Sequence, residues 1–315
     1  MVYLNSHSIE NLDTANGSII MLGNFDGMHI GHMALFNVLT AQAKAGGYTK
    51  IVFSFSPHPQ YFLSGQNPGL LLGSREKIHL LDSLGADIFI EYPFDDILRS
   101  MTPEEFIKTV LVGKLHAKAI VIGDDYSFGK NREGNADYLR KLGSTYGFDV
   151  YVVDAVTHNG ERVSSSTIRD YAAARNFARC NELLARPYQI SGIVVHGRGL
   201  GRTLGFPTIN MQPEPDKLLP PNGVYLTETT IDGTTYKSIT NIGVSPTVFG
   251  SEATAIRCET YIYGFNSDVY NQEAIVRFYD SIRDEQKFSD IDALASQVQK
   301  DIEKGLELWK KSELQ

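Results

Sequence analysis

The sequence has little of what would tie a protein to a membrane or to an oxidising compartment. Its 315 residues include only two cysteines, Cys180 and Cys258, which lie far apart without a CxxC pair, so neither a disulfide framework nor a zinc site is expected. No apolar run approaches the roughly 20 residues that span a bilayer, and the first basic residue, Lys44, comes too late for the positive start of a signal peptide. We therefore expect a cytoplasmic protein with two reduced thiols and no membrane partner.

Basic charge is also scarce. The chain has 29 Lys and Arg against 37 Asp and Glu, which gives a net charge of −8. Divided after residue 185, each part carries a net charge of −4. This argues against a broad nucleic-acid-binding surface, and we expect no nucleic-acid partner. A small anionic ligand held by a few local groups remains compatible with such a charge.

Length and composition indicate two globular domains. A domain holds about 150 residues as a soft rule, and 42% hydrophobic with 21% charged residues is typical of a folded chain. Because the pattern changes near Pro187, we predict one domain over residues 1–184 and a second over residues 185–315.

The first part alternates short apolar runs with helical patterns. The expected strands are 18–23, 51–55, 87–91, 119–123 and 150–153. The expected helices are 32–45, 75–84, 103–111 and 136–146. Continuous apolar runs fit strands buried on both faces, and strand–helix alternation predicts a doubly wound parallel α/β sheet. Such sheets bind ligands where the carboxyl ends of their strands give way to helices.

The second part contains apolar runs separated by turns rather than by helices. The expected strands are 190–195, 223–229, 236–241, 255–263 and 274–279. This pattern predicts an all-β domain, either an antiparallel barrel or a sandwich. A last helix is expected where apolar residues recur at steps of three or four, namely Ile291, Leu294, Val298, Ile302, Leu306 and Trp309. We expect that stripe to pack against the β domain.

The run GNFDGMHIGH, which begins at Gly23, joins the first expected strand to the first expected helix. Gly23, Gly27 and Gly31 permit tight turns and close approach of a ligand. His29 and His32, three residues apart on one helical turn, would face the same way and could both donate to a phosphate at the helix N-terminus. Two surface histidines, or a metal pair, are the alternatives, although no carboxylate or cysteine stands at helical spacing to complete a metal site.

Two further loops follow expected strands of the first part. Asp125 lies in GDDYSFG after the fourth strand, and Arg162 begins RVSSSTIR after the fifth. Hydroxyls and two guanidinium groups, Arg162 and Arg169, would grip a phosphate well at an apparent helix start. The serines of this run, Ser165 and Ser166 among them, could equally be helix N-caps.

The run HGRGLGRTLGFPTIN contains the first candidate site residues of the second part. Its glycine-rich loop, with Arg202 and Gly205, could cradle phosphates or form only a flexible hairpin. If PTIN is extended, Thr208 and Asn210 project to one face, where a hydroxyl and an amide carbonyl suit Mg²⁺ together with phosphates and water; an ordinary strand start is the alternative. Glu259, within an apolar strand, is either solvent-facing or a base aimed into a site.

The GNFDGMHIGH run resembles the GxFDGxHxGH signature of the nucleotidyltransferase superfamily. A four-letter HIGH also occurs in class I aminoacyl-tRNA synthetases, but the chain has no KMSKS-like element and is short and acidic for a tRNA binder. Over residues 18–310 the chain resembles the bacterial bifunctional riboflavin kinase/FMN adenylyltransferase family, the FAD synthetases. The further motifs that carry this resemblance are GFPTIN from Gly205, NIGVSPT from Asn241, Glu259, RFY from Arg277 and IRDEQKF from Ile282.

The resemblance implies an N-terminal nucleotidyltransferase domain followed by an antiparallel β-barrel kinase domain with a C-terminal helix. It implies that His29 and His32 act on the ATP phosphates, that Thr208 and Asn210 hold Mg²⁺, and that Glu259 is the general base of the kinase. Contacts to ATP or its phosphates are implied for Gly23, Asn24, Phe25, Asp26, Gly31, Asp125, Arg162, Ser165, Ser166, Arg169, Arg202 and Gly205. The chain departs from the family pattern at Tyr126, Ser166, Ile209 and Val248.

The implied activity has two steps. Riboflavin would be phosphorylated by ATP to FMN, and FMN would be adenylylated by a second ATP to FAD and pyrophosphate. The expected partners are therefore riboflavin, FMN, FAD and ATP, with the oligomeric state left open between a monomer and transient self-association. An adenylyltransferase of another substrate with a ligand-binding β half, and a non-catalytic flavin sensor, are the alternatives.

Overall fold

The computed structural model describes residues 1–7, 9, 12, 14, 16–197, 199–245 and 255–312. The chain forms two compact units. The first consists of residues 1–68 and 72–165, and the second of residues 69–71 and 166–315. The expected departure at Val248 lies outside the described residues.

A six-stranded parallel sheet forms the centre of the first unit, in the order β1-β4-β3-β2-β5-β6. Its strands are β1 (Val2–Leu4), β2 (Ser18–Leu22), β3 (Thr49–Ser56), β4 (Ile88–Pro93), β5 (Ala117–Gly123) and β6 (Asp149–Val153). The predicted parallel sheet is confirmed, with one strand more than expected. Strand β1 was missed because three residues at a sheet edge are too short to show a pattern.

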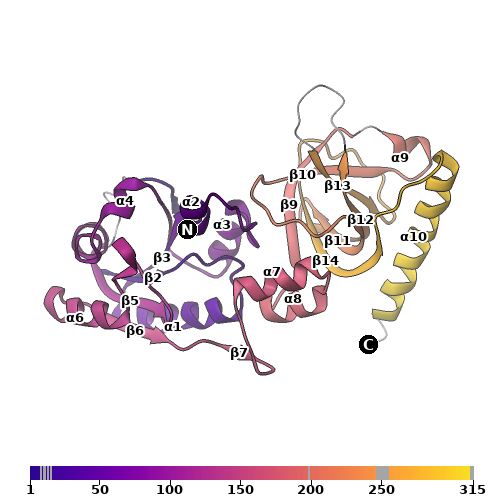
Figure 1. Cartoon of the computed structure of the whole chain (residues 1–315). Helices are drawn as coiled ribbons and strands as arrows, with labels where there is room; N and C mark the ends of the chain where they lie inside the picture. The colour runs from indigo at the N-terminus through magenta and orange to yellow at the C-terminus, as the bar shows by residue number, and fades with distance from the viewer. Residues whose placement is uncertain are drawn as a thin grey trace. The chain divides into compact units, whose positions relative to one another are not determined.

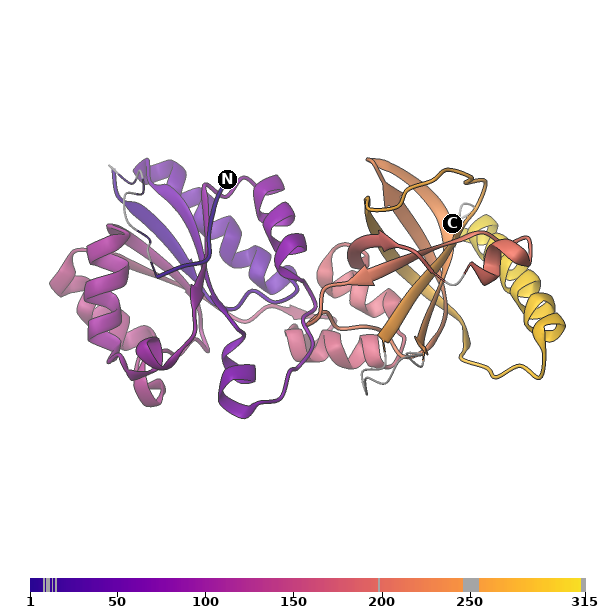
Figure 2. The same ribbon diagram turned by 90° about the horizontal axis from the view of Figure 1, so that it is seen from above.

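Helices cover both faces of this sheet (Figures 1 and 2). They are α1 (Ile30–Gly46), α2 (Pro59–Ser64), α3 (Ser74–Ser83), α4 (Asp96–Ser100), α5 (Pro103–Phe106), η1 (Ile107–Lys114) and α6 (Ala136–Tyr146), with a short 3₁₀ turn η2 (Lys130–Arg132). Alternate residues of β2 serve the two faces: Ile19 and Met21 pack with α1, whereas Ile20 and Leu22 pack with η1 and α6. The sheet is therefore doubly wound.

Local signals explain where the helices begin and end. Helix α6 matches the predicted range because Asn135 caps its start by accepting the Tyr138 N–H, and Gly147 ends it in the left-handed conformation. The predicted helix 103–111 begins at a capping box of Thr102 and Glu105 but continues as the π-helical η1. Helices α2 and α4 were missed because five or six residues give no periodic pattern.

The strand order reverses beside β2. Strands β3 and β4 follow β2 on one side, whereas β5 pairs with β2 on the other. The loops that leave the carboxyl ends of β2 and β5 therefore diverge, which opens the place where doubly wound sheets bind ligands. The Gly23 loop leaves β2, and the loop with Asp125 leaves β5.

A short hairpin, β7 (Thr157–His158) with β8 (Glu161–Arg162), completes the first unit. Helices α7 (Ser165–Ala173) and α8 (Phe177–Leu184) follow, and most of α7 and all of α8 belong to the second unit. There Phe177 stacks on Phe278 at 5.3 Å, and Arg175 forms an ion pair with Asp284 at 2.6 Å. The compact units thus divide at Ser165, while the functional boundary at residues 184/185 stays a prediction.

The second unit is a closed six-stranded antiparallel barrel in the order β10-β13-β12-β11-β14-β9. Its strands are β9 (Tyr188–Val195), β10 (Thr208–Pro213), β11 (Gly223–Ile231), β12 (Thr234–Ser245), β13 (Ala255–Ile262) and β14 (Glu273–Asp284). Two helices accompany it, α9 (Leu200–Thr203) and α10 (Ile291–Ser312). The barrel with a C-terminal helix confirms the fold class.

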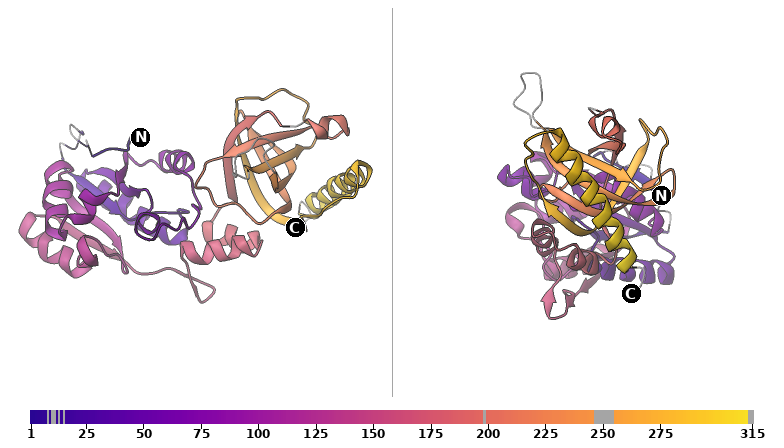
Figure 3. Two further views of the ribbon diagram at one scale, coloured as in Figure 1. Left: turned by 45° about the horizontal axis from the view of Figure 1, so that its top comes forward. Right: turned by 90° about the vertical axis from the view of Figure 1, so that its right-hand side faces the viewer.

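Helix α10 lies along the outside of the barrel (Figure 3). Ile302 and Trp309 are buried there against Val224 of β11. The predicted apolar stripe is only partly right, because Ile291 is 57% and Leu306 39% exposed. Ile291 is the first residue of the helix. Among the described residues, no helix has both the length and the apolar character to cross a membrane.

Both cysteines are buried in the packed interior of the second unit. Burial raises the pKa of the Cys180 and Cys258 thiols to about 12, because a thiolate would lose its hydration there. The two side chains therefore carry their protons at neutral pH, which makes them poor nucleophiles.

A hydrogen-bonded set of hydroxyls fills part of the barrel interior. Thr227 bonds to Ser238 at 2.8 Å and to Thr240 at 2.9 Å, and the set extends to Thr229 and Thr260. All five side chains are 0% exposed. Buried hydroxyls are costly unless paired, so this network ties β11, β12 and β13 into one register.

We expect Thr227→Val to lower the free energy of unfolding of the barrel by about 1–3 kcal/mol, because Ser238 and Thr240 each lose a buried partner. Urea unfolding followed by the fluorescence of Trp309, the single tryptophan, reports on this unit. The control is Thr235→Val, which removes an exposed hydroxyl that bonds to Thr230 and should change stability by no more than about 0.5 kcal/mol. Equal effects of the two variants would contradict a structural role for the interior network.

Candidate active sites

The loop between β2 and α1 is built by close packing of its backbone. Phe25 has a φ of +50°, Gly27 one of +86° and Met28 one of +39°, so three residues of the loop lie in the left-handed region. A Cβ on Gly23 would lie 2.8 Å from the Phe25 ring, so only glycine lets the ring fold back over the strand end. Asp26 is 3% exposed, and its Oδ1 accepts the Leu72 N–H at 3.1 Å. These contacts hold the loop in one conformation.

His29 and His32 lie side by side at the start of α1. Their ring centroids are 3.7 Å apart, with 16° between the ring planes. His29 caps the helix: its Nδ1 accepts the His32 backbone N–H at 3.3 Å, so the neutral ring carries its proton on Nε2. A Cβ on Gly31 would lie 3.1 Å from the His29 ring, a tight contact that glycine avoids. Two imidazoles at a helix N-terminus form an arrangement suited to an anionic phosphate.

The loop also meets the start of the RVSSSTIR helix. Ser165 donates its hydroxyl to the Asp26 carbonyl at 2.7 Å. Its neighbours Ser166 and Arg169 lie on α7 in the second unit, where the Arg169 Nε donates to the Gly69 carbonyl at 2.9 Å. The structure thus joins Ser165 to the Asp26 loop and assigns Ser166 and Arg169 to the other compact unit.

Arg162 and Asp125 form an exposed ion pair. The Arg162 Nη2 lies 2.7 Å from Asp125 Oδ2 and 3.6 Å from Asp124 Oδ1. The side chains of Arg162 and Asp125 are 54% and 73% exposed, so water screens the attraction and the pair contributes little to stability.

A second candidate site lies on the outer face of the barrel. Asn210 of β10 pairs with Glu259 of β13, which pairs with Asn241 of β12. The neighbours of Glu259 along β13, Cys258 and Thr260, are 0% exposed and point into the barrel, so alternation places Glu259 outside. Directly opposite residues have Cβ atoms about 5 Å apart. The three polar side chains therefore form a row across three strands.

Thr208 extends this row. It pairs with Tyr261, whose side chain packs against the cluster that contains Trp309 of α10, and it therefore shares the outer face. The Thr208 hydroxyl and the Asn210 amide, two residues apart on β10, thus share one surface with the Glu259 carboxylate opposite Asn210.

The glycine-rich loop lies directly on these side chains. A Cβ on Gly197 would be 2.2 Å from the Asn210 Nδ2, and a Cβ on Gly201 would be 3.1 Å from the Thr208 Oγ1. Gly205 has a φ of +83°, and Arg202 is exposed. The glycines leave room for the Thr208 and Asn210 side chains because they have no Cβ atoms. Hydroxyl and amide oxygens are hard ligands, so Thr208 and Asn210 fit the donor set of a Mg²⁺ site.

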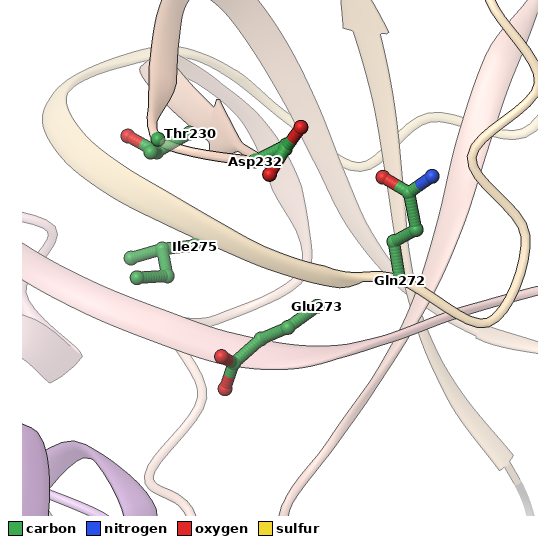
Figure 4. A pocket seen from close by; sticks show the side chains of 6 residues that line it. Thr230, Asp232, Gln272, Glu273 and Ile275 are labelled. Carbon is green, nitrogen blue, oxygen red and sulfur yellow. The ribbon is translucent and has the colours of Figure 1, made fainter.

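Other features of the described residues do not compete with these two sites. No group of three or more His, Cys, Asp or Glu side chains there could hold a metal ion. A surface hollow lies at the β11–β12 turn, with Thr230, Asp232 and Glu273 around it (Figure 4). Thr230 lies six residues along β11 from Val224, which is in register with Asn241, so the hollow is about 20 Å from the polar row.

Sequence reasoning missed three polar residues near the sites. Asn241 belongs to the quoted NIGVSPT motif, and its place opposite Glu259 could have been inferred only with the strand register. Lys77 and Glu91 form a buried ion pair at 3.5 Å in the first unit. The one available signal was the charged Glu91 within the otherwise apolar strand residues IFIEY.

Comparisons with known proteins match both units. Residues 12–167 match the family model described as FAD synthetase, and residues 184–309 match the one described as riboflavin kinase. A bifunctional riboflavin kinase/FMN adenylyltransferase of Pseudomonas fluorescens is 35% identical over 286 residues, 91% of each chain. The protein of that description from Escherichia coli K12 is 36% identical over 297 residues, 93% of this chain and 94% of the relative.

A solved structure from Streptococcus pneumoniae, described as a macrolide-efflux protein, has the same fold. It is 29% identical, with a TM-score of 0.84 over 96% of this chain and 98% of its own.

Fold and sites together define a two-module phosphate-transferring enzyme, with a nucleotidyltransferase-type parallel sheet and a kinase-type barrel. Because full-length relatives match across both modules in the same order, the class can be narrowed further. The chain belongs to the bifunctional riboflavin kinase/FMN adenylyltransferase family.

We expect Gly197→Ala to reduce riboflavin kinase activity at least about tenfold, because the added methyl group would displace the Asn210 side chain. FMN adenylyltransferase activity, measured on the same preparation, should stay within about twofold. The control is Gly243→Ala on β12, whose Cβ would come no closer than 3.4 Å to any neighbour and should be tolerated. Unchanged kinase activity in Gly197→Ala would contradict the cradle around Asn210.

Proposed function

We propose that the barrel phosphorylates riboflavin with ATP and that the parallel-sheet unit adenylylates the FMN so formed. The observation that supports this best is the match of both units, in order, to the two family models and to full-length bifunctional relatives. Two features favour working sites over a protein that only binds flavin. They are the polar row of Asn210, Glu259 and Asn241, and the stacked pair of His29 and His32.

In the proposed kinase step, Glu259 takes the proton of the 5′-hydroxyl of the ribityl chain. The oxygen then attacks the γ-phosphorus of ATP, the bond to the bridging oxygen breaks, and ADP leaves. Thr208 and Asn210 would hold Mg²⁺, which when bound neutralises phosphate charge. Arg202 and the backbone around Gly205 would hold the phosphates, and the glycine loop would keep Asn210 facing them.

In the proposed adenylyl step, a phosphate oxygen of FMN attacks the α-phosphorus of a second ATP, and pyrophosphate leaves. No strong base is needed, because the attacking phosphate is already anionic, so catalysis consists of positioning and charge stabilisation. His29 and His32 would donate to the ATP phosphates. The loop of Gly23, Asn24, Phe25 and Asp26, the N-terminus of α1, and the side chains of Asp125, Arg162 and Ser165 would complete the site within the first unit. For Ser166 and Arg169, which belong to the second unit, a contact to ATP is implied by the family resemblance alone.

We expect Glu259→Gln to lower riboflavin phosphorylation by about 100-fold or more, because the amide does not accept the proton. Conversion of added FMN to FAD by the same variant should be unchanged. Both are measured by chromatography of flavins after incubation with ATP and Mg²⁺. Glu273→Gln is the control, a carboxylate of the same barrel beside the hollow of Figure 4. Loss of both activities in a folded Glu259→Gln protein would count against the assignment.

The histidine pair has the opposite expectation. In His29→Asn, which keeps a side chain able to cap α1, and in His32→Gln, FAD formation should fall about 100-fold while FMN accumulates, because a donor to the transition-state charge is lost. His79→Gln, an exposed histidine on α3, should leave both products unchanged. Undiminished FAD formation in both site variants would rule the pair out as the phosphate-binding group.

A further inference from the structure

A buried ion pair lies in the first unit behind the loop between β2 and α1. Lys77 of α3 is 5% exposed and Glu91 of β4 is 4% exposed, and the Lys77 Nζ lies 3.5 Å from the Glu91 Oε1. Burying two charges is expensive, and such a pair often contributes less to stability than apolar side chains of the same size would. The pair therefore calls for an explanation other than stability.

The carboxylate of this pair is held from several sides. Glu91 accepts the Tyr3 hydroxyl at 2.8 Å on Oε2 and the Ser74 hydroxyl at 3.3 Å on Oε1. These donors fix Glu91 in place, and Glu91 in turn fixes the ammonium group of Lys77. The ammonium also lies over the Phe89 ring, 5.8 Å from its centroid. Lys77 is thus anchored at a definite point beneath the loop.

From that point Lys77 reaches the first turn of the loop. Its Nζ donates to the Asn24 carbonyl oxygen at 3.4 Å, and the Ser54 hydroxyl donates to the same oxygen at 2.9 Å. Ser54 and Glu91 are neighbours in the register of β3 and β4, so both donors come from one polar cluster. A single hydroxyl would satisfy this carbonyl, and the added charged donor is more than folding requires.

Holding the carbonyl also fixes the N–H on the other side of the peptide. The bond between Asn24 and Phe25 is trans, so the Phe25 N–H points away from the Asn24 oxygen and hence away from Lys77. If this peptide turned over, it would present a carbonyl oxygen in place of an N–H to an anion bound by the loop. The positive φ of Phe25 is a strained conformation that persists only where its surroundings hold it.

We propose that Lys77 is a positioning residue for adenylyl transfer. Its ammonium, anchored by Glu91, fixes the peptide between Asn24 and Phe25 so that the N–H faces the ATP phosphates. Lys77 itself touches no substrate. This inference rests on the proposed function of the first unit and adds to it a residue pair from α3 and β4.

The test measures the ATP dependence of FAD formation from FMN. In Lys77→Met the KM for ATP should rise about tenfold or more, because the N–H no longer holds its direction toward a charged group. The KM for FMN and the riboflavin kinase activity of the same molecules should stay within about twofold. Lys77→Arg should restore part of the affinity for ATP, because its guanidinium can donate to the same carbonyl.

Two further variants separate positioning from folding. Lys77→Met/Glu91→Gln leaves no unpaired buried charge, so it should fold and still show the raised KM for ATP. Ser54→Ala removes the other donor to Asn24, and its combination with Lys77→Met should lose more than the product of the single losses, because either donor alone partly holds the carbonyl. Lys50→Met is the matched control: Lys50 also donates to a backbone carbonyl, that of Gly85, and lies 3.9 Å from Asp87, but at the amino end of β3.

The outcomes are distinct. A normal KM for ATP in Lys77→Met/Glu91→Gln would overturn the role of Lys77 while the wild-type protein still made FAD. A change of equal size in Lys50→Met would also overturn it, because the effect would then belong to any lysine that donates to a backbone carbonyl beside β3 or α3. Failure of the wild-type chain to convert FMN would overturn the proposed function, and the role of Lys77 with it.

Discussion

Close approach of backbone to side chain is the constraint on which both candidate sites depend. In the first unit, the backbone at Gly31 lies so near the His29 ring that a Cβ would come within 3.1 Å. In the second, the backbone at Gly197 leaves a Cβ only 2.2 Å from the Asn210 amide. In each case the missing Cβ lets a loop press a polar side chain into one orientation. This close contact orders the side chain before a ligand binds. A side chain that already has a single rotamer loses no conformational entropy on binding.

This constraint suits a chain with so few positive charges. Net charges of −4 in each part supply no general attraction for ATP or flavin phosphates, so affinity has to come from fixed local donors. Helix α1 directs its N-terminus at the His29 loop, and Arg162 stands exposed on β8. Local donors act at short range, and their strength depends on direction. For affinity toward phosphates, a peptide oriented by Lys77 or an amide oriented by Gly197 therefore matters more than one further surface lysine would.

The sequence predicted what periodicity and local chemistry encode. Buried strands such as β2 and β5 were found because both of their faces are apolar, and α6 was found because Asn135 and Gly147 mark its ends. Pairings between distant residues were not found. The pair of Lys77 and Glu91 needs the approach of α3 to β4, and the packing of α7 and α8 with the barrel needs Arg175 to meet Asp284, more than 100 residues later. No local pattern encodes such contacts.

The candidate sites divide in the same way. The histidine pair and the glycine loop could be read from spacing, whereas the row of Asn210, Glu259 and Asn241 needed the barrel register. The interior of the barrel fixes that register. Thr260 and Thr240 bond to one another inside the barrel at 2.9 Å, and alternation then places Glu259 and Asn241 together outside. A slip of β13 by one residue would bury Glu259 and expose Thr260. The inner hydroxyls thus determine which polar side chains stand on the outer face, where we propose the kinase site.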